Sequence, residues 1–274
     1  MKYRYAALTA ILIGIVLFLF ARQETKVSPL EKIGESSSLR LIIIYDNYQF
    51  RRDLPTGWGF SCVVVSNKTL LFDTGGDGRL LLHNLKSIGL DPKDVDYVFL
   101  SHIHHDHTGG LFDFLECNSN VTVFLPKSFP WKFKDEVKRT GARIVEVSGP
   151  EKLVENFYST GEMGFWIKEQ SLIISTERGL VVITGCAHPG IVSIVKRAKE
   201  LTNKEILLVL GGFHLIGKDE SELRRIALEF KEMGVKHVAP CHCSGDLARK
   251  IFREEFGDSF IEVGVGKIID LSEL

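Results

Sequence analysis

The stretch Ser101-His102-Ile103-His104-His105-Asp106-His107-Thr108-Gly109-Gly110 follows directly on the largely apolar run 95–100. Four imidazoles and one carboxylate occupy six consecutive positions of a segment that leaves a predicted strand. Imidazole and carboxylate suit zinc, iron and manganese, and catalytic sites keep one coordination position open. A solvated histidine tract can bind metal adventitiously, but a buried strand and a Gly-Gly turn do not normally frame such a tract. We interpret the stretch as a catalytic metal site.

The order of these residues predicts two ions. If the chain is extended, His102 and His104 project to one side and could hold one ion. Asp106 and His107, beyond a bend, could hold the second. A binuclear site usually needs more ligands than one loop offers, so the remaining histidines matter.

Three more histidines follow predicted strands. His188 lies in Gly185-Cys186-Ala187-His188-Pro189-Gly190, His214 in Gly211-Gly212-Phe213-His214, and His242 in Pro240-Cys241-His242-Cys243-Ser244-Gly245. Because loops at strand ends carry function, we expect these histidines to converge on one rim. His188 and His242 are predicted metal ligands, and the predicted catalytic residues are Asp106, His188 and His214. His83 and His237 are interpreted as ordinary core or surface histidines.

The five cysteines are scattered, so a core and not a set of disulfides is expected to hold the domain together. Cys186 is placed beside a metal, as a soft ligand or in a supporting role. Cys241 and Cys243 alternate away from His242 and are expected to pack behind it. Cys62 is a predicted core residue, and Cys117 a small apolar filler or surface thiol.

Asp73 ends the strand-like run 70–72 and precedes Thr74-Gly75-Gly76. An acidic residue in this place can orient a metal-binding histidine through its free ring nitrogen. It can also be a plain turn signal. Beside the histidine-rich loop we favour the supporting role for Asp73.

Short apolar runs alternate with amphipathic patterns along the rest of the chain, which predicts an α/β fold with sheets covered by helices. Strands are expected at 39–45, 59–65, 69–72, 97–100, 121–125, 143–147, 171–176, 180–184, 206–210, 237–239 and 260–263. Helices are expected at 79–88, 128–139, 191–201, 220–233 and 244–256.

Three segments are predicted along the chain: a hydrophobic helix at 1–22 that is a membrane anchor or a signal segment, a polar linker at 23–38 and a catalytic domain at 39–274. Residues 5–21 carry no charge, and Lys2 and Arg4 precede them. These features favour an uncleaved membrane anchor with the catalytic domain outside the cytoplasm. The formal net charge is −1 and charges of both signs are intermixed, so the chain has no positive electrostatic field that would attract nucleic acid.

The residues Leu71-Phe72-Asp73-Thr74-Gly75 and the H-x-H-x-D-H signature of His102, His104, Asp106 and His107 resemble the metallo-β-lactamase superfamily. The resemblance covers the chain from about residue 39 onward. It implies a four-layer αββα sandwich with two divalent metal ions at the edge between the sheets. Zinc is the expected metal, with iron or manganese as alternatives.

A narrower resemblance rests on Tyr45-Asp46-Asn47, on Gly57-Trp58-Gly59-Phe60-Ser61 and on the three histidine motifs described above. Together they are similar to the branch named for 7,8-dihydropterin-6-ylmethyl-4-(β-D-ribofuranosyl)aminobenzene 5′-phosphate synthase. The chain departs from the superfamily in having no histidine between His107 and His188. Either His188 or Glu169 would fill the missing ligand place, and Cys186 occupies the place of the usual bridging aspartate.

The resemblance implies a synthase that joins a dihydropterin methyl diphosphate to ribofuranosylaminobenzene 5′-phosphate. The alternative is a hydrolase of a phosphoester, lactone or thioester that acts through a metal-bound hydroxide. A membrane anchor would count against the synthase. A third possibility is a tethered binding protein with structural metal. Trp58, Phe60 and Phe213 are predicted to contact the substrate, a pterin or phosphorylated small molecule, with Arg51 and Arg52 as possible phosphate partners.

Overall fold

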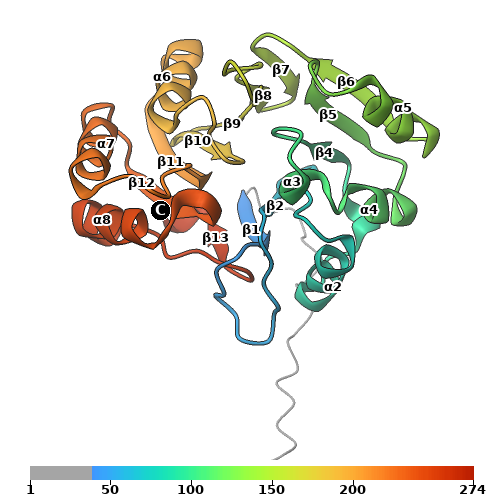
Figure 1. Cartoon of the computed structure of the whole chain (residues 1–274), viewed down its shortest axis with the longest axis horizontal. Coiled ribbons are helices and arrows are strands. Elements are labelled where there is room, and N and C mark those ends of the chain that lie inside the picture. Colours follow the sequence, from blue (N-terminus) through green and yellow to red (C-terminus); the bar gives the residue numbers. More distant parts are fainter. Residues whose placement is uncertain (1–38) are drawn as a thin grey trace, which may run out of the picture. The chain divides into compact units, whose positions relative to one another are not determined.

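Two β-sheets form the centre of the computed structural model, which describes residues 39–274. The first sheet has the strand order β13-β1-β2-β3-β4-β5-β6, and the second has the order β12-β11-β10-β9-β8-β7 (Figure 1). The strands of the first sheet are β1 (Arg40–Tyr45), β2 (Ser61–Val65), β3 (Thr69–Phe72), β4 (Tyr97–Phe99), β5 (Thr122–Pro126), β6 (Arg143–Val147) and β13 (Ile268–Asp270). Those of the second are β7 (Glu151–Val154), β8 (Phe157–Ser159), β9 (Leu172–Thr176), β10 (Gly179–Thr184), β11 (Ile206–Gly212) and β12 (His237–Cys241).

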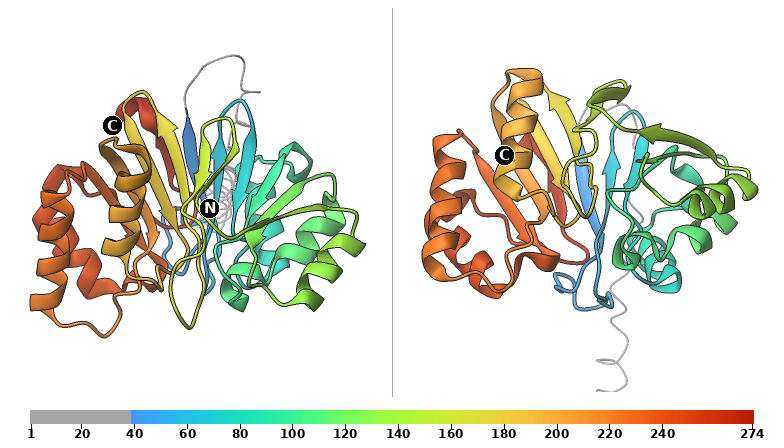
Figure 2. Two further views of the ribbon diagram at one scale, coloured as in Figure 1. Left: turned by 90° about the horizontal axis from the view of Figure 1, so that it is seen from above. Right: turned by 45° about the horizontal axis from the view of Figure 1, so that its top comes forward.

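Helices cover the outer face of each sheet, so that the layers run helix, sheet, sheet, helix (Figure 2). The α-helices within residues 39–274 are α2 (Gly78–Ile88), α3 (His105–Thr108), α4 (Leu111–Cys117), α5 (Trp131–Arg139), α6 (Ile191–Thr202), α7 (Glu220–Glu232) and α8 (Asp246–Phe256). Helices α2 and α5 contact the first sheet, whereas α6 and α8 contact the second. The prediction of an α/β fold with helix-covered sheets is confirmed for this part of the chain.

The core lies in two main layers. Residues such as Phe72, Phe99 and Ile183 fill the space between the sheets, and residues such as Ile194, Phe230 and Phe252 fill the space between the second sheet and its helices. Strand β11 contributes to both layers, and every one of its residues is buried. A strand covered on both faces needs apolar side chains on both, which explains its continuous apolar sequence.

Each sheet begins with antiparallel hairpins and continues with parallel strands. Strands β3 to β6 run parallel in the first sheet, and β10 to β12 run parallel in the second. Parallel neighbours require a crossover connection, and each crossover here contains at least one helix. The crossover from β3 to β4 contains α2, that from β4 to β5 contains α3 and α4, and that from β5 to β6 contains α5. In the second sheet, α6 lies between β10 and β11, and α7 lies between β11 and β12. The carboxyl ends of parallel strands gather at one edge of a sheet, and the crossover loops that leave this edge are the usual place for a ligand site.

Two predictions about the chain ends need correction. The segment 260–263 is not a strand, because Phe260 makes only a single bridge to Val238, and the last strand is Ile268–Asp270 instead. The predicted anchor (1–22) and linker (23–38) lie outside the described residues. Within 39–274, every helix is too short or too polar to span a bilayer. This finding overturns the predicted membrane-anchored, extracytoplasmic localisation and the predicted membrane partner, and both are withdrawn.

Candidate metal centre

The predicted metal residues meet at the carboxyl ends of five parallel strands. Asp73 follows β3, and the histidine-rich loop with α3 follows β4. His188 follows β10, His214 follows β11 and His242 follows β12. Both sheets therefore send their crossover loops to one place, which is why residues more than a hundred positions apart lie together. Of the four imidazoles in the opening stretch, only that of His105 lies on an exposed residue.

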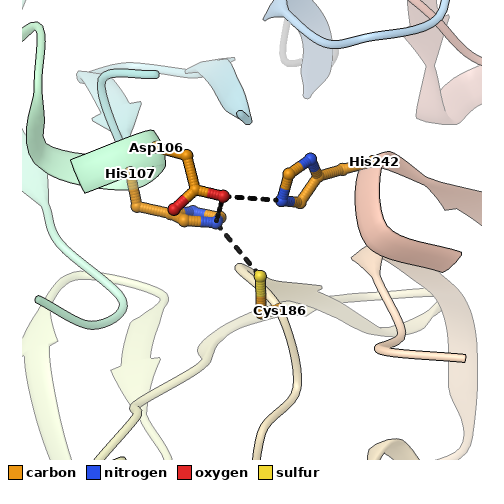
Figure 3. Close-up of side chains that lie close together, drawn as sticks. All are labelled: Asp106, His107, Cys186 and His242. Atoms are coloured by element: carbon orange, nitrogen blue, oxygen red, sulfur yellow. Dashed lines mark hydrogen bonds and ion pairs between the residues drawn. The ribbon is translucent and has the colours of Figure 1, made fainter. Parts of the chain in front are cut away.

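Asp106, His107, Cys186 and His242 form the first donor group (Figure 3). Oδ2 of Asp106 lies 3.3 Å from Nε2 of His242 and 3.7 Å from Nε2 of His107. Nε2 of His107 lies 3.2 Å from Sγ of Cys186. Burial opposes ionisation of Asp106, but His242 and His107 outweigh it and hold the pKa of this carboxyl well below its ordinary value. An ionised carboxylate, two imidazoles and a sulfur thus face a common point.

His102, His104 and His188 lie together beside this group. The ring centroids of His102 and His188 are 4.8 Å apart, and those of His104 and His188 are 4.9 Å apart. Burial lowers the pKa of His102 well below its ordinary value, and the neighbouring His107 and His188 lower it further. Burial and His214 lower the pKa of His188 to about 4. Both rings are therefore neutral near pH 7, which is the form that binds metal.

Asp73 holds the ring of His107 from behind. Its Oδ2 lies 2.7 Å from Nδ1 of His107 and accepts a hydrogen bond from Oγ of Ser101 at 2.6 Å, while its Oδ1 accepts one from the backbone N–H of Ser101 at 2.7 Å. Asp73 is fully buried. Burial opposes protonation of His107, but the Asp73 carboxylate outweighs burial and raises the pKa of the ring. A proton on Nδ1 leaves Nε2 free to face Asp106 and Cys186.

Glu169 fastens the turn that carries Cys186 and His188. Its Oε1 accepts hydrogen bonds from the backbone N–H groups of Cys186 at 3.0 Å and Ala187 at 2.8 Å, and its Oε2 accepts one from that of His188 at 2.8 Å. Burial raises the pKa of Glu169 to about 7. Both carboxylate oxygens of Glu169 thus accept from the backbone, and the ring of His188 lies beside those of His102 and His104. The choice of His188 over Glu169 as the missing ligand stays a prediction.

The opposite wall is held by Asp46 and Asn47, whose roles were missed from the sequence. Nδ1 of His242 lies 3.0 Å from Oδ1 of Asn47, and the backbone N–H of His242 donates to Oδ1 of Asp46 at 3.3 Å. Burial raises the pKa of Asp46 to about 6. The motif Tyr45-Asp46-Asn47 was visible as a family resemblance, but its distance of nearly two hundred residues from His242 hid the contact.

Within residues 39–274, three groups of side chains have donor atoms close enough to hold a metal ion, and Cys186 belongs to each of them. The third of these groups consists of Cys186, His214 and Cys243. Cys243 was expected to pack behind His242, and this prediction was wrong. Residues His242–Ser244 form a 3₁₀ turn, so that the alternation of an extended chain does not apply and Cys243 lies on the same side as Cys186. Cys241 is fully buried, within the core between the sheets, and Cys62 is also a core residue.

The aromatic residues predicted to contact substrate separate into two kinds. Trp58 is 54% exposed, and its ring centroid lies 4.9 Å from that of His242, at the rim of the site. Phe60 packs edge-on against Phe72 between the sheets, and Phe213 packs between Phe230 and Phe252 under the helices. Both are buried, so they offer no surface to a ligand and are not retained as binding residues. Arg51, which was predicted as a phosphate partner, forms a salt bridge with Asp53.

The donor atoms fit divalent metal ions. Nε2 of His188 is buried and has no hydrogen-bond partner among the described residues, whereas Nε2 of His242 faces the Asp106 carboxylate at 3.3 Å. An unpaired buried ring nitrogen is costly, and a metal ion removes this cost. The remaining donors are imidazole, carboxylate and thiol, which are the ligands of zinc and related ions.

Comparison with known proteins agrees with this geometry. The family model of the metallo-beta-lactamase superfamily matches residues 57–199. The 7,8-dihydropterin-6-methyl-4-(beta-D-ribofuranosyl)-aminobenzene-5′-phosphate synthase of Methanocaldococcus jannaschii is 30% identical over 88% of this chain and 99% of its own length. The N-acyl homoserine lactonase of Bacillus cereus is 25% identical over 54% of this chain and 71% of its own.

Among solved structures, Tm1679, described as a metal-dependent hydrolase of the beta-lactamase superfamily, superposes with a TM-score of 0.73. It is 31% identical, and the match covers 84% of this chain and 98% of that one. These relatives confirm the resemblance drawn from the H-x-H-x-D-H signature. Membership implies divalent metal binding and a small-molecule substrate, whereas zinc as the metal stays a prediction. The chain therefore belongs to the metallo-beta-lactamase superfamily and is an enzyme of that fold.

Proposed function

We propose that this enzyme joins a dihydropterin methyl diphosphate to ribofuranosylaminobenzene 5′-phosphate and releases diphosphate. The observation that carries the proposal is the 30% identity to the archaeal synthase, which extends over 88% of this chain and 99% of that protein. A similarity that spans a relative's whole length includes the substrate pocket as well as the metal residues.

Two divalent ions would be held by the donors that lie together. His102, His104 and His188 would bind one ion, and Asp106, His107 and His242 would bind the other. The sulfur of Cys186 lies within 4.8 Å of donor atoms of His102 and His188 and also of Asp106, His107 and His242, and as a thiolate it would bind both ions. Zinc suits this mixture of imidazole, carboxylate and sulfur, and iron or manganese is the alternative.

In this reaction the amine nitrogen forms a bond to the methylene carbon as the bond from that carbon to the diphosphate oxygen breaks. The bound metal would supply Lewis-acid stabilisation of the departing phosphate oxygens. The protein's own part is to fix the donors: Asp73 sets the ring of His107, and Glu169 sets the turn of His188. The exposed ring of Trp58 offers a flat face on which a pterin or an arylamine can stack.

Hydrolysis of a phosphoester, lactone or thioester is the second candidate. It is favoured by the similarity to Tm1679, which is described as a metal-dependent hydrolase and whose chain is covered over 98% of its length. The same ligands would then lower the pKa of a water molecule and direct it at the substrate. The two candidates differ in the nucleophile, an amine or water, and this difference can be measured.

The test is diphosphate release from the dihydropterin diphosphate by the metal-loaded enzyme, with and without the arylamine phosphate. We expect release only with the amine, and its loss in His104→Ala but not in the matched surface control His83→Ala. Release that does not depend on the amine, or turnover of model esters alone, would reject the synthase in favour of the hydrolase.

A further inference from the structure

A third set of donors adjoins the ion pair proposed above and shares only Cys186 with it. One ligand atom from each of Cys186, His214 and Cys243 lies within 4.8 Å of the other two. The ring centroid of His214 lies 4.5 Å from that of His188, so this set adjoins the histidine group. His214 is exposed, whereas both sulfurs are buried.

The backbone joins the two loops that supply His214 and Cys243. Strands β11 and β12 are parallel neighbours and end together, with Gly212 opposite Cys241. Beyond their ends, the N–H of Leu215 donates to the carbonyl of Cys243 at 3.2 Å, and the N–H of Phe213 donates to Oγ of Ser244 at 3.0 Å. These bonds hold the two loops together beyond the ends of the strands.

Two backbone features make room for this arrangement. A Cβ at Gly212 would lie 2.7 Å from Sγ of Cys243 and would also collide with the carbonyl oxygen of Gly185. His214 itself has a φ of +53°, in the left-handed region that is uncommon for a residue with a side chain. Backbone strain of this kind is tolerated mainly where a function depends on it.

Two thiols and one imidazole form a donor set with a known use. Cys₂His is one of the three-ligand sets by which catalytic zinc is bound with its fourth position open. The imidazole of His214 is exposed, so this donor set can be reached from solvent. We propose that Cys186, His214 and Cys243 bind a third zinc ion, whose open position accepts an anionic oxygen of the substrate. The thiols lose their protons to solvent as zinc binds.

This proposal goes beyond the ion pair, with which it shares the sulfur of Cys186. The experiment is the zinc content of the full-length protein after zinc loading and dialysis, together with the thiolate-to-metal absorption of the Co²⁺-substituted form. We expect three ions in the wild type and two in Cys243→Ala and His214→Ala. The absorption should fall in Cys243→Ala, which loses one of the two sulfur ligands.

Cys117→Ala is the matched control, because Cys117 is an exposed free cysteine on α4. It should keep three ions and the full absorption. His104→Ala should lose an ion of the pair and keep the absorption that depends on Cys243, which separates the two proposals. Because His214 is exposed, its variant tests the site even if Cys243→Ala fails to fold. A wild type with two ions, or a His214→Ala variant with as many ions as the wild type, would overturn the proposal.

Discussion

Replacing Asp73 with asparagine tests how the metal centre depends on a residue that would not touch the metal. In the wild type Oδ2 of Asp73 faces Nδ1–H of His107 at 2.7 Å, and Oδ1 accepts from the N–H of Ser101. The amide oxygen of asparagine can keep the Ser101 bond, but its NH₂ then points at Nδ1 of His107. The ring can accept that bond only by moving its proton to Nε2, the atom that faces Asp106 and Cys186.

Loss of such a supporting carboxylate typically weakens metal binding by about 10- to 100-fold. This corresponds to about 1.4 to 2.7 kcal/mol, since each factor of ten is ~1.4 kcal/mol. The assay is competition for Zn²⁺ against a chromogenic chelator, with circular dichroism to verify the fold. Asp77→Asn is the matched control, because Asp77 caps α2 and asparagine caps a helix equally well. An Asp73→Asn protein that binds zinc as tightly as the control would refute the reasoning.

Three further predictions follow from the same structure. His188→Ala should lose at least one ion by elemental analysis while His83→Ala keeps all of them, and equal metal content in the two variants would contradict the placement of His188. Acidification should release the ion of His102 and His188 only as the pH falls toward about 4, the pKa of His188, because protonated imidazole cannot ligate; loss of all metal already near pH 6, followed with a metal-sensitive dye, would speak against these ligands. Gly212→Ala should lower the free energy of unfolding by about 1 to 3 kcal/mol through overpacking against Cys243 and Gly185, measured by urea denaturation, whereas Gly149→Ala, where a Cβ meets nothing within 4 Å, should change it little.

Much of the fold could be predicted because its strands are buried. The strands Thr69–Phe72 and Arg143–Val147 have the predicted bounds, and α6 and α7 differ from prediction by one residue at one end. Strands β7 and β8 were missed, since β7 is partly exposed and begins with two charged residues, so it lacks the apolar signal of a core strand. The short helices α3 and α4 were missed because they lie within and just after the histidine loop, where no helical period can develop.

The site was predictable where histidines follow strands and not predictable where side-chain direction decides. His188, His214 and His242 lie together because parallel strands of one sheet end at one edge. Phe60 and Phe213 lie beside site motifs in the sequence, yet both side chains are part of the hydrophobic core. The identity of an aromatic residue does not reveal the direction in which its ring points. The supporting contacts of Glu169 and Asn47 join distant segments, so no local pattern could have shown them.

The central claim is that six residues from three loops bind a pair of divalent ions around Cys186. Anomalous X-ray diffraction from zinc-loaded crystals tests it most directly. One peak is expected among His102, His104 and His188 and a second among Asp106, His107 and His242, both beside the sulfur of Cys186 and both distinct from the third ion proposed at His214 and Cys243. Anomalous maps in which no peak lies against either set of residues would contradict it.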